Sequence, residues 1–250
     1  MRKLEICVDS LESAIKAQRA GADRIELCMA LSEGGITPSY GLIKQCVENL
    51  SIKVNVIIRP RGGDFLYNGT EFDTMKQDIV FCREIGVNAV VSGVLNADGS
   101  VDVKRTKELV DLARPMEFTF HRAFDVCADY EQGIEDIISC KADRILSSGG
   151  EPTAEAGMDL LKKLIRRAGD RIIIMPGSGI NPENLEKIMN FTGAKEVHAS
   201  ASVIIESSMQ YRPEKISMNS YGVSDYFRKQ SDEAKIRQLK EILNRMDRGE

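Results

Sequence analysis

The sequence predicts an α/β fold, a single TIM-type (β/α)8 barrel that occupies residues 1–250. Three observations support this prediction: eight short β-branched runs recur along the chain, amphipathic segments with helical spacing separate them, and 250 residues is a typical length for one such barrel. Strands that alternate with helices form parallel sheets, and eight strands close into a barrel. The alternative is an open doubly wound sheet, but its G-x-G-x-x-G sequence does not follow the first run.

The eight predicted strands follow one another along the whole first four-fifths of the chain. In order they are LEICV (4–8), RIELC (24–28), KVNVIIR (53–59), NAVVSG (88–93), EFTFH (117–121), DRILS (143–147), RIIIMP (171–176) and KEVHAS (195–200). Helical segments such as SLESAIKAQRAG, YGLIKQCVENL, TKELVDLAR and GMDLLKKLIRRAG lie between them. Several strands are entered alike, through GADRIELC, GVNAVVSG, KADRILSS and GAKEVHAS, which indicates a weak internal repeat.

The chain after the eighth strand departs from this alternation. Residues 201–230 are rich in Ser, Met and Tyr, and we expect an irregular segment there. Residues 231–247 predict a final helix with Ser231 as its N-cap. In the preceding unit, Asn181 and Pro182 are the predicted N-cap and first residue of a helix.

Composition and charge narrow the class of protein. The chain is 42% hydrophobic and 29% charged, its net charge is -4 and its pI is about 5.5, which is typical of a soluble globular enzyme and favours neither nucleic acid nor an anionic membrane as partner. No apolar run approaches the roughly 20 residues that span a bilayer. The N-terminus lacks the apolar core of a signal peptide. Six cysteines without C-x-x-C spacing predict reduced thiols, and we expect a cytoplasmic protein.

Polar side chains alternate along several predicted strands toward the ends where barrel active sites lie. Because the outer face of each strand is covered by helices, an unpaired carboxylate there would be costly, so these side chains are predicted to point inward. The inward set is Glu5 and Cys7 on the first strand, Glu26 and Cys28 on the second, Asn55 and Arg59 on the third, Thr119 and His121 on the fifth, and His198 on the eighth. An ordinary barrel interior holds Val, Ile and Leu, so this set predicts a functional site.

The chemistry of this set suggests acids, bases and thiols in one place. The candidate catalytic residues are Glu5, Glu26, Arg59, His121, Arg122, Asp125 and His198. An alternative is a structural ion-pair network in which Glu5 and Glu26 pair with Arg59 and Arg122. Such a network is also a setting in which pKa values shift.

Two glycine-rich loops predict an anion site beside these residues. SSGGEPT (147–153) follows the sixth strand and PGSGINPENL (176–185) follows the seventh, where barrels often bind phosphate. Backbone N–H groups at a helix start favour negative charge. The candidate anion-binding residues are Arg61, Ser148, Gly149, Gly150, Gly177, Ser178 and Gly179.

The sequence resembles the CutC family, named for copper homeostasis, over roughly residues 4 to 211. The resemblance is carried by EICVDS, GADRIELC, LSEGGITPSYG, VNVIIRPRGGDFLY, GVLNADGSVD, TFHRAFD, RILSSGG, MPGSGI and EVHAS. It implies a cytosolic (β/α)8 barrel that is usually oligomeric, with a dimer expected here. It also implies a link to copper tolerance and Cu(I) binding through cysteines at the positions of Cys7 and Cys28.

Two functions follow as hypotheses. Cu(I) is soft and prefers thiolates, so Cys7 and Cys28 on neighbouring strands could share one ion. The rival hypothesis is an enzyme doing acid/base chemistry on a small anionic or phosphorylated metabolite, with His121, Glu26 or Asp125 moving protons and Arg59, Arg61 and the glycine loops holding the anion. Copper homeostasis is named first because the resemblance is specific.

Overall fold

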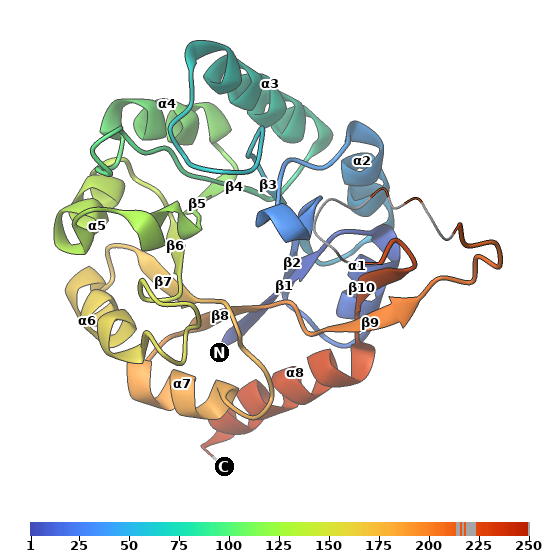
Figure 1. The fold of residues 1–250 in the computed structure, drawn as a ribbon. Coiled ribbons are helices and arrows are strands. Elements are labelled where there is room, and N and C mark those ends of the chain that lie inside the picture. Colours follow the sequence, from blue (N-terminus) through green and yellow to red (C-terminus); the bar gives the residue numbers. More distant parts are fainter. Residues whose placement is uncertain (214–215, 217, 219–223, 250) are drawn as a thin grey trace.

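The computed structural model describes residues 1–213, 216, 218 and 224–249. Eight parallel strands form one sheet that curls into a nearly closed barrel, and helices surround it (Figure 1). The strands are β1 (Lys3–Val8), β2 (Arg24–Leu27), β3 (Lys53–Ile57), β4 (Ala89–Ser92), β5 (Glu117–Phe120), β6 (Arg144–Ser147), β7 (Ile173–Pro176) and β8 (Glu196–Ala199). The predicted (β/α)8 barrel is confirmed, and each predicted strand matches an observed one to within two residues at either end.

The strand register decides which side chains meet inside the barrel. Strands β1 to β7 are neighbours in chain order, and β8 lies beside β1. Glu5 of β1 is directly opposite His198 of β8, and Cys7 of β1 is opposite Glu26 of β2. Within the described residues, β7 and β8 contact each other but are not joined by a ladder of backbone hydrogen bonds. The register therefore brings four residues of the predicted site onto three adjacent strands.

The helices cover the outside of the barrel with their apolar faces. They are α1 (Leu11–Arg19), α2 (Tyr40–Asn49), α3 (Gly69–Ile85), α4 (Val103–Ala113), α5 (Tyr130–Ser139), α6 (Met158–Ala168), α7 (Leu185–Thr192) and α8 (Glu233–Arg248). Outward strand residues such as Leu4, Ile6 and Ile25 are fully buried in the core that the helices complete. Since strand side chains alternate, the polar residues between them face the barrel interior.

Both capping predictions differ from the structure. Helix α7 begins at Leu185 with Asn184 as its N-cap, so Asn181 and Pro182 lie in the turn before it, where the Asn181 side chain accepts the N–H groups of Glu183 and Asn184. The prediction of Ser231 as the cap of α8 is wrong. Asp232 caps this helix by accepting the N–H of Lys235, because Ser231 ends a strand and its own N–H donates to the Ser13 hydroxyl.

The segment 201–230 is not entirely irregular, which corrects the prediction for it. Strand β9 (Ser202–Glu206) pairs antiparallel with β10 (Phe227–Ser231), and this hairpin projects beyond the ring of helices (Figure 1). The run Val203–Ile205 is β-branched, which suits a strand, whereas the many serines around it obscured the pattern. Residues 214, 215, 217 and 219–223 of this segment lie outside the described residues.

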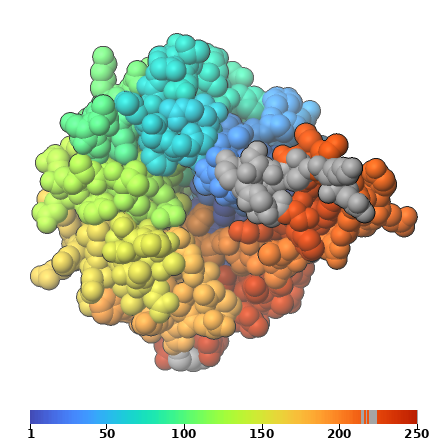
Figure 2. Space-filling model, in the orientation of Figure 1, coloured from blue at the N-terminus to red at the C-terminus, as the bar shows by residue number. Residues whose placement is uncertain are grey.

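Loops surround the face of the barrel that is turned toward the viewer in Figure 1. In Figure 2 the centre of this face is a depression enclosed by the surrounding segments. Two short 3-10 helices lie in these loops, η1 (Leu31–Glu33) after β2 and η2 (Arg122–Val126) after β5. None of the helices in the described part of the chain has both the length and the apolar character needed to cross a lipid bilayer.

Candidate functional site

Five polar side chains meet inside the barrel, near the C-terminal ends of adjacent strands. This mouth cluster consists of Glu5, Cys7, Glu26, Cys28 and His198. All of them were predicted to point inward, and the contacts between them confirm that they do. Four are buried and Cys7 is partly exposed.

Glu5 and His198 form the rigid part of the mouth cluster. The His198 Nδ1 atom lies 2.8 Å from Glu5 Oε1, and Glu5 Oε2 accepts hydrogen bonds from Arg24 and from Asn55. Burial alone would raise the pKa of Glu5, but Arg24 and His198 outweigh it and hold that pKa well below its usual range. The carboxylate therefore stays ionised and fixes the orientation of the imidazole.

The two sulfurs stand beside this pair. Cys7 Sγ and Cys28 Sγ are 3.6 Å apart, and Cys28 Sγ is 3.5 Å from Glu26 Oε2. The hydrogen bond shared with Cys28, helped by His198, lowers the pKa of Cys7 to about 6 against the effect of burial. The same shared bond and burial raise the pKa of Cys28 well above its usual value. At neutral pH the pair is therefore one thiolate and one thiol.

Glu26 and His198 carry protons that their ordinary pKa values would not predict at neutral pH. Burial raises the pKa of Glu26 to about 8, so this side chain is mostly protonated. Burial would lower the pKa of His198, but Cys7, Glu5 and Glu26 raise it well above its usual value. The His198 Nε2 atom is 3.7 Å from Glu26 Oε2. The mouth cluster thus contains a thiolate, an imidazolium, a carboxylate and a neutral acid in contact.

His121 borders the mouth cluster but is bound differently. Its Nδ1 accepts the N–H of Ala123, so the proton of the neutral ring is on Nε2, which is buried and has no hydrogen-bond partner among the described residues. Burial and the nearby Arg59 lower the pKa of His121 to about 3, so the ring is uncharged. Phe65 packs against the ring with centroids 4.9 Å apart.

Arg59 and Arg61 make their hydrogen bonds and ion pairs to other residues of the protein. The Arg59 guanidinium donates to the backbone carbonyls of Glu33, Gly35 and Gly63, and its side chain is buried. Arg61 pairs with Asp64 and Glu71. The alternative network of Glu5 and Glu26 with Arg59 and Arg122 is wrong, because Arg24 is the partner of Glu5.

The loop after β6 encloses a carboxylate of the protein itself. Asp125 accepts hydrogen bonds from the N–H groups of Ser148 and Gly150, from the hydroxyls of Ser147 and Ser148, and from Arg122 Nε. Gly149 donates its N–H to the Ser147 hydroxyl. In this structure the predicted anion-binding N–H groups at 148 and 150 are therefore used by Asp125.

The loop after β7 packs against the mouth cluster. A Cβ atom on Gly177 would lie 2.6 Å from Leu146 and 3.3 Å from His198, so only glycine lets this loop approach the histidine. Ser178 has a φ of 81°, in the region that favours glycine, and donates its hydroxyl to the Pro152 carbonyl. Gly179 follows with a φ of 70°.

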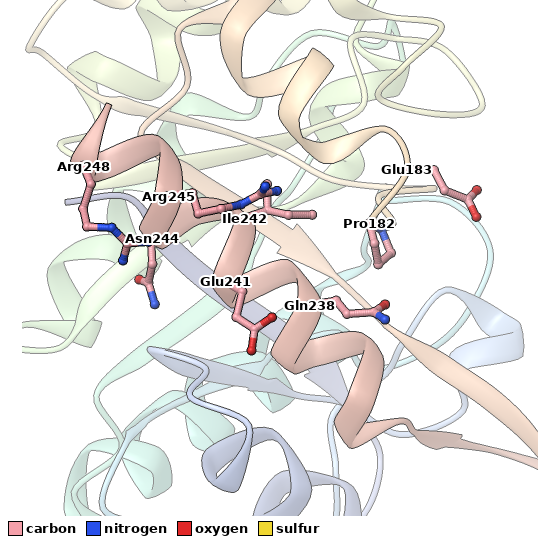
Figure 3. Close-up of a pocket in the computed structure, with 8 residues that line it drawn as sticks. All are labelled: Pro182, Glu183, Gln238, Glu241, Ile242, Asn244, Arg245 and Arg248. Atoms are coloured by element: carbon pink, nitrogen blue, oxygen red, sulfur yellow. The ribbon is translucent and has the colours of Figure 1, made fainter. Parts of the chain in front are cut away.

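A cavity of about 120 Å³ opens onto the mouth cluster. Its apolar walls are Ile57, Phe65 and Leu146, and its polar lining is Cys7, Glu26, Cys28, Arg59, His121, Arg122 and His198, with Gly34 at the edge. A larger hollow of about 720 Å³ lies elsewhere, between α8 and the segment before α7. Figure 3 shows its lining, which is Pro182, Glu183, Gln238, Glu241, Ile242, Asn244, Arg245 and Arg248. The smaller cavity is the candidate site because it contains the buried titratable groups.

Four charged residues that were not predicted as part of the site lie below the mouth cluster. Arg24 donates to both Glu5 and Glu196, and Arg144 donates to both Glu196 and Glu117. The signal was present, since Arg24 alternates with Glu26 along β2 and Glu196 alternates with His198 along β8.

The mouth cluster has the donor atoms of a metal site. Ligand atoms of Cys7, Glu26 and His198 lie within 4.8 Å of one another, and Cys28 stands beside Cys7. With metal–sulfur bonds of about 2.3 Å, the value for zinc thiolates, the 3.6 Å between the sulfurs corresponds to an angle of roughly 100° at the metal. A linear two-sulfur site would need about 4.6 Å at the same bond length. The residues therefore fit a bent site completed by His198 or Glu26.

Comparisons with known proteins agree on one family. The model of the CutC family matches residues 2–203. A Chromobacterium violaceum protein named CutC is 47% identical over 242 residues, which are 97% of this chain and 98% of that protein. The human protein named copper homeostasis protein cutC homolog is 43% identical over 240 residues, 96% of this chain and 88% of that protein.

Solved structures give the same result for the fold. The crystal structure of CutC from Streptococcus agalactiae has a TM-score of 0.76 and 34% identity, and the match covers 80% of this chain and 99% of that one. Phosphoribosyl anthranilate isomerase from Thermotoga maritima matches with a TM-score of 0.58 at 14% identity, covering 98% of this chain and 99% of that one. The second match shows the barrel fold alone.

Proposed function

The chain belongs to the CutC family, and from this premise we propose that it acts in copper homeostasis by binding Cu(I) at the mouth cluster. Cys7 and Cys28 supply the two sulfurs, and His198 supplies a nitrogen through Nε2. The observation that carries the proposal is the 3.6 Å separation of the sulfurs beside His198 and Glu26. Relatives at 43% identity are named for copper homeostasis, which supports the choice of metal.

The donor set suits a soft metal ion. Thiolates select Cu(I), and imidazole is an acceptable further ligand for copper. His198 already donates its Nδ1–H to Glu5, and a ligating histidine is fixed by such a contact with a carboxylate behind it. Cys7 needs little further help to lose its proton, because its pKa is about 6.

The strand register favours a shared ion over a disulfide. Cys7 is opposite Glu26, so Cys28 lies two residues further along the neighbouring strand. With strands about 4.8 Å apart and a rise of about 3.3 Å per residue, the two Cα atoms are roughly 8 Å apart. A disulfide needs a Cα separation below about 7 Å, so it would require backbone movement. A bridging ion does not.

An anaerobic competition titration with a chromogenic Cu(I) chelator tests the proposal. The wild-type protein should take one equivalent of Cu(I), and the variant Cys7→Ser/Cys28→Ser should take none. Cys127→Ser is the matched control, because Cys127 is a buried free thiol that does not line the cavity. Unchanged binding in the double variant would overturn the proposal, and a parallel Zn(II) titration reports whether the site distinguishes the two ions.

A second candidate function is acid/base catalysis on a small anionic or phosphorylated metabolite. The observation that favours it is that Glu26 and His198, in contact, both hold protons at neutral pH while Glu5 does not. Because Arg59 is occupied by backbone carbonyls, Arg122, which is half exposed, is the cation available to an anion. Thermal melting with phosphate and phosphorylated metabolites is the test, and a shift abolished by Arg122→Ala would support this candidate.

Location and assembly complete the proposal. We propose that the protein acts in the cytoplasm as a dimer. The six cysteines are free, which suits a reducing compartment. Cell fractionation checks the location and light scattering of the purified protein checks the assembly. Recovery in the membrane fraction, or a monomer mass, would contradict the respective part.

A further inference from the structure

Beyond metal binding, we propose that Cys7, His198 and Glu5 form a nucleophile–base–carboxylate triad that accepts a short acyl group. The reaction class is hydrolysis or transfer of a short-chain acyl ester or thioester. Cys7 is the nucleophile, His198 is the general base, and Glu5 is a positioning residue that acts through His198. This function does not depend on the copper proposal, although both use Cys7 and His198.

The contacts reproduce the requirements of a triad. The His198 Nδ1 atom is 2.8 Å from Glu5 Oε1, so the imidazole has a fixed orientation and Nε2 is directed to the other side. On that side the ligand atoms of Cys7, Glu26 and His198 all lie within 4.8 Å of one another, and Nε2 is 3.7 Å from Glu26 Oε2. A nucleophile beside a base that is oriented by a third group is the arrangement that activates cysteine.

The fixed carboxylate has more support than ion pairing alone needs. Both oxygens of Glu5 are used, Oε1 by His198 and Oε2 by Arg24 and Asn55. A carboxylate held on both sides cannot turn away from the histidine. This rigidity is what preorganised catalysis requires of the group that positions the base.

The cavity limits the size and character of the acyl group. Cys7 lines it and is partly exposed, whereas Cys46, Cys82, Cys127 and Cys140 do not line it and are buried. Its volume of about 120 Å³ equals about four waters at roughly 30 Å³ each, which suits an acetyl or propionyl group. Ile57, Phe65 and Leu146 provide apolar walls for that chain.

A donor for the acyl oxygen lines the same cavity. His121 carries its proton on Nε2, and that atom has no acceptor among the described residues. The oxygen of a tetrahedral intermediate gains negative charge, and a preorganised donor stabilises it. We assign His121 Nε2 to the carbonyl oxygen, which it reaches once the buried ring turns toward the cavity.

The reaction balances without any oxidant or reductant. The Cys7 thiolate adds to the carbonyl carbon beside the protonated His198. The intermediate collapses, the bond to the leaving alcohol or thiol breaks, and the leaving group takes the Nε2 proton of His198. Water then adds to the S-acyl Cys7 while the neutral His198 accepts its proton, the carboxylic acid leaves, and the Cys7 thiolate and the protonated His198 are restored.

The experiment uses p-nitrophenyl acetate and the full-length protein, freed of metal by a chelator and kept reduced. We expect a burst of one equivalent of nitrophenolate and an acetyl group on the peptide that contains Cys7. Cys7→Ala should abolish both. His198→Gln should slow the burst roughly 100-fold, within the range that general base catalysis contributes. Cys127→Ser is the control and should match the wild type.

Glu5 has its own readout, because its role is positional. Glu5→Gln should slow the burst and shift its pH profile, and Glu5→Asp should restore part of the rate. Melting curves of each variant show whether it folds. If His198→Gln does not fold, Glu5→Gln carries the test.

Several results would overturn the triad. They are acetylation of other residues as fast as Cys7, a burst unaffected by His198→Gln, or no adduct at all. A copper titration on the same preparation separates the proposals. Copper binding without acylation leaves the copper function standing and removes this inference, whereas acylation without stoichiometric copper does the reverse.

Discussion

Two buried polar clusters occupy the same barrel, and they differ in how their charges are balanced. The base network, made of Arg24, Glu196, Arg144 and Glu117, joins the N-terminal ends of the strands. Its arginine and glutamate side chains alternate, and the N–O distances between them are 2.6 to 2.7 Å. The mouth cluster at the other end contains acids and thiols in excess of the cations that could pair with them.

The difference separates stability from function within one fold. In the base network each carboxylate meets a guanidinium, so its ionised state needs no further partner. In the mouth cluster Glu26 is kept protonated by burial and two thiols share one hydrogen bond, which leaves groups that can bind or react. In barrels of this kind the N-terminal face serves stability and the C-terminal face serves chemistry.

The largest expected effect is on stability, and it belongs to the base network. Glu196→Gln removes the carboxylate shared by Arg24 and Arg144, and breaking such a buried pair costs roughly 3–5 kcal/mol of unfolding free energy. Glu26→Gln, the matched change in the mouth cluster, should cost far less at pH 7 because Glu26 is already neutral there. Urea unfolding of both variants is the measurement. An equal loss in the two would remove the distinction between the clusters.

The next effect is on copper affinity, and it belongs to the mouth cluster. Cys7→Ser removes a proposed direct ligand, so the loss of affinity should exceed the roughly 10–100-fold cost of removing a residue that only orients a ligand. Competition with a Cu(I) chelator measures it. The same assay on Glu117→Gln, in the base network, should show wild-type affinity. A loss of similar size in Glu117→Gln would mean that copper reports on folding.

A smaller loss of copper affinity is expected for Glu5, the residue that joins the two clusters. Glu5 orients His198 without contacting the sulfurs that we propose as metal ligands, so Glu5→Gln should weaken Cu(I) binding roughly 10–100-fold. Glu5 also holds Arg24, and the variant should therefore lose stability as well. Affinity and melting temperature measured on one preparation separate the two effects. Wild-type affinity in a destabilised Glu5→Gln would assign Glu5 to the base network alone.

The last effect concerns the pH dependence of stability. The pKa of Glu26 is about 8 in the folded protein against an ordinary 4.5, so the folded state keeps a proton that the unfolded chain loses. Its contribution is fully present below about pH 4.5 and is lost as the pH rises through 8. Glu26→Gln has no such titration. The difference in unfolding free energy between the variant and the wild type should therefore shift in favour of the variant from about pH 4.5 to 8 and stay constant above that. Denaturation at a series of pH values checks it, and a constant difference would contradict the assigned shift.

The sequence was sufficient for the barrel and for the mouth cluster. Alternation along β1, β2 and β8 turned Glu5, Cys7, Glu26 and His198 inward, and the parallel register then brought them together. The same alternation turns Arg24 and Glu196 inward. These residues begin β2 and β8, at the N-terminal ends of the strands, whereas the site was predicted at the C-terminal ends.

Pairings across loops could not be read from the sequence. Arg59 and Asp125 were predicted as site residues from their places at strand ends, but Arg59 donates to three backbone carbonyls and Asp125 accepts hydrogen bonds from the loop after β6. Such contacts depend on the path of each loop, and periodicity carries no information about that path. The distance between Cys7 and Cys28 depends on register in the same way.

X-ray absorption on the Cu(I)-loaded protein tests most directly whether copper binds at the mouth cluster. We expect one equivalent of copper bound by two sulfurs and one nitrogen in a bent arrangement. Cys7→Ser/Cys28→Ser should retain no copper after the same loading, and in His198→Gln the nitrogen contribution should be lost while the sulfurs remain. A spectrum that is the same in wild type and in Cys7→Ser/Cys28→Ser would place the copper elsewhere and contradict the central claim.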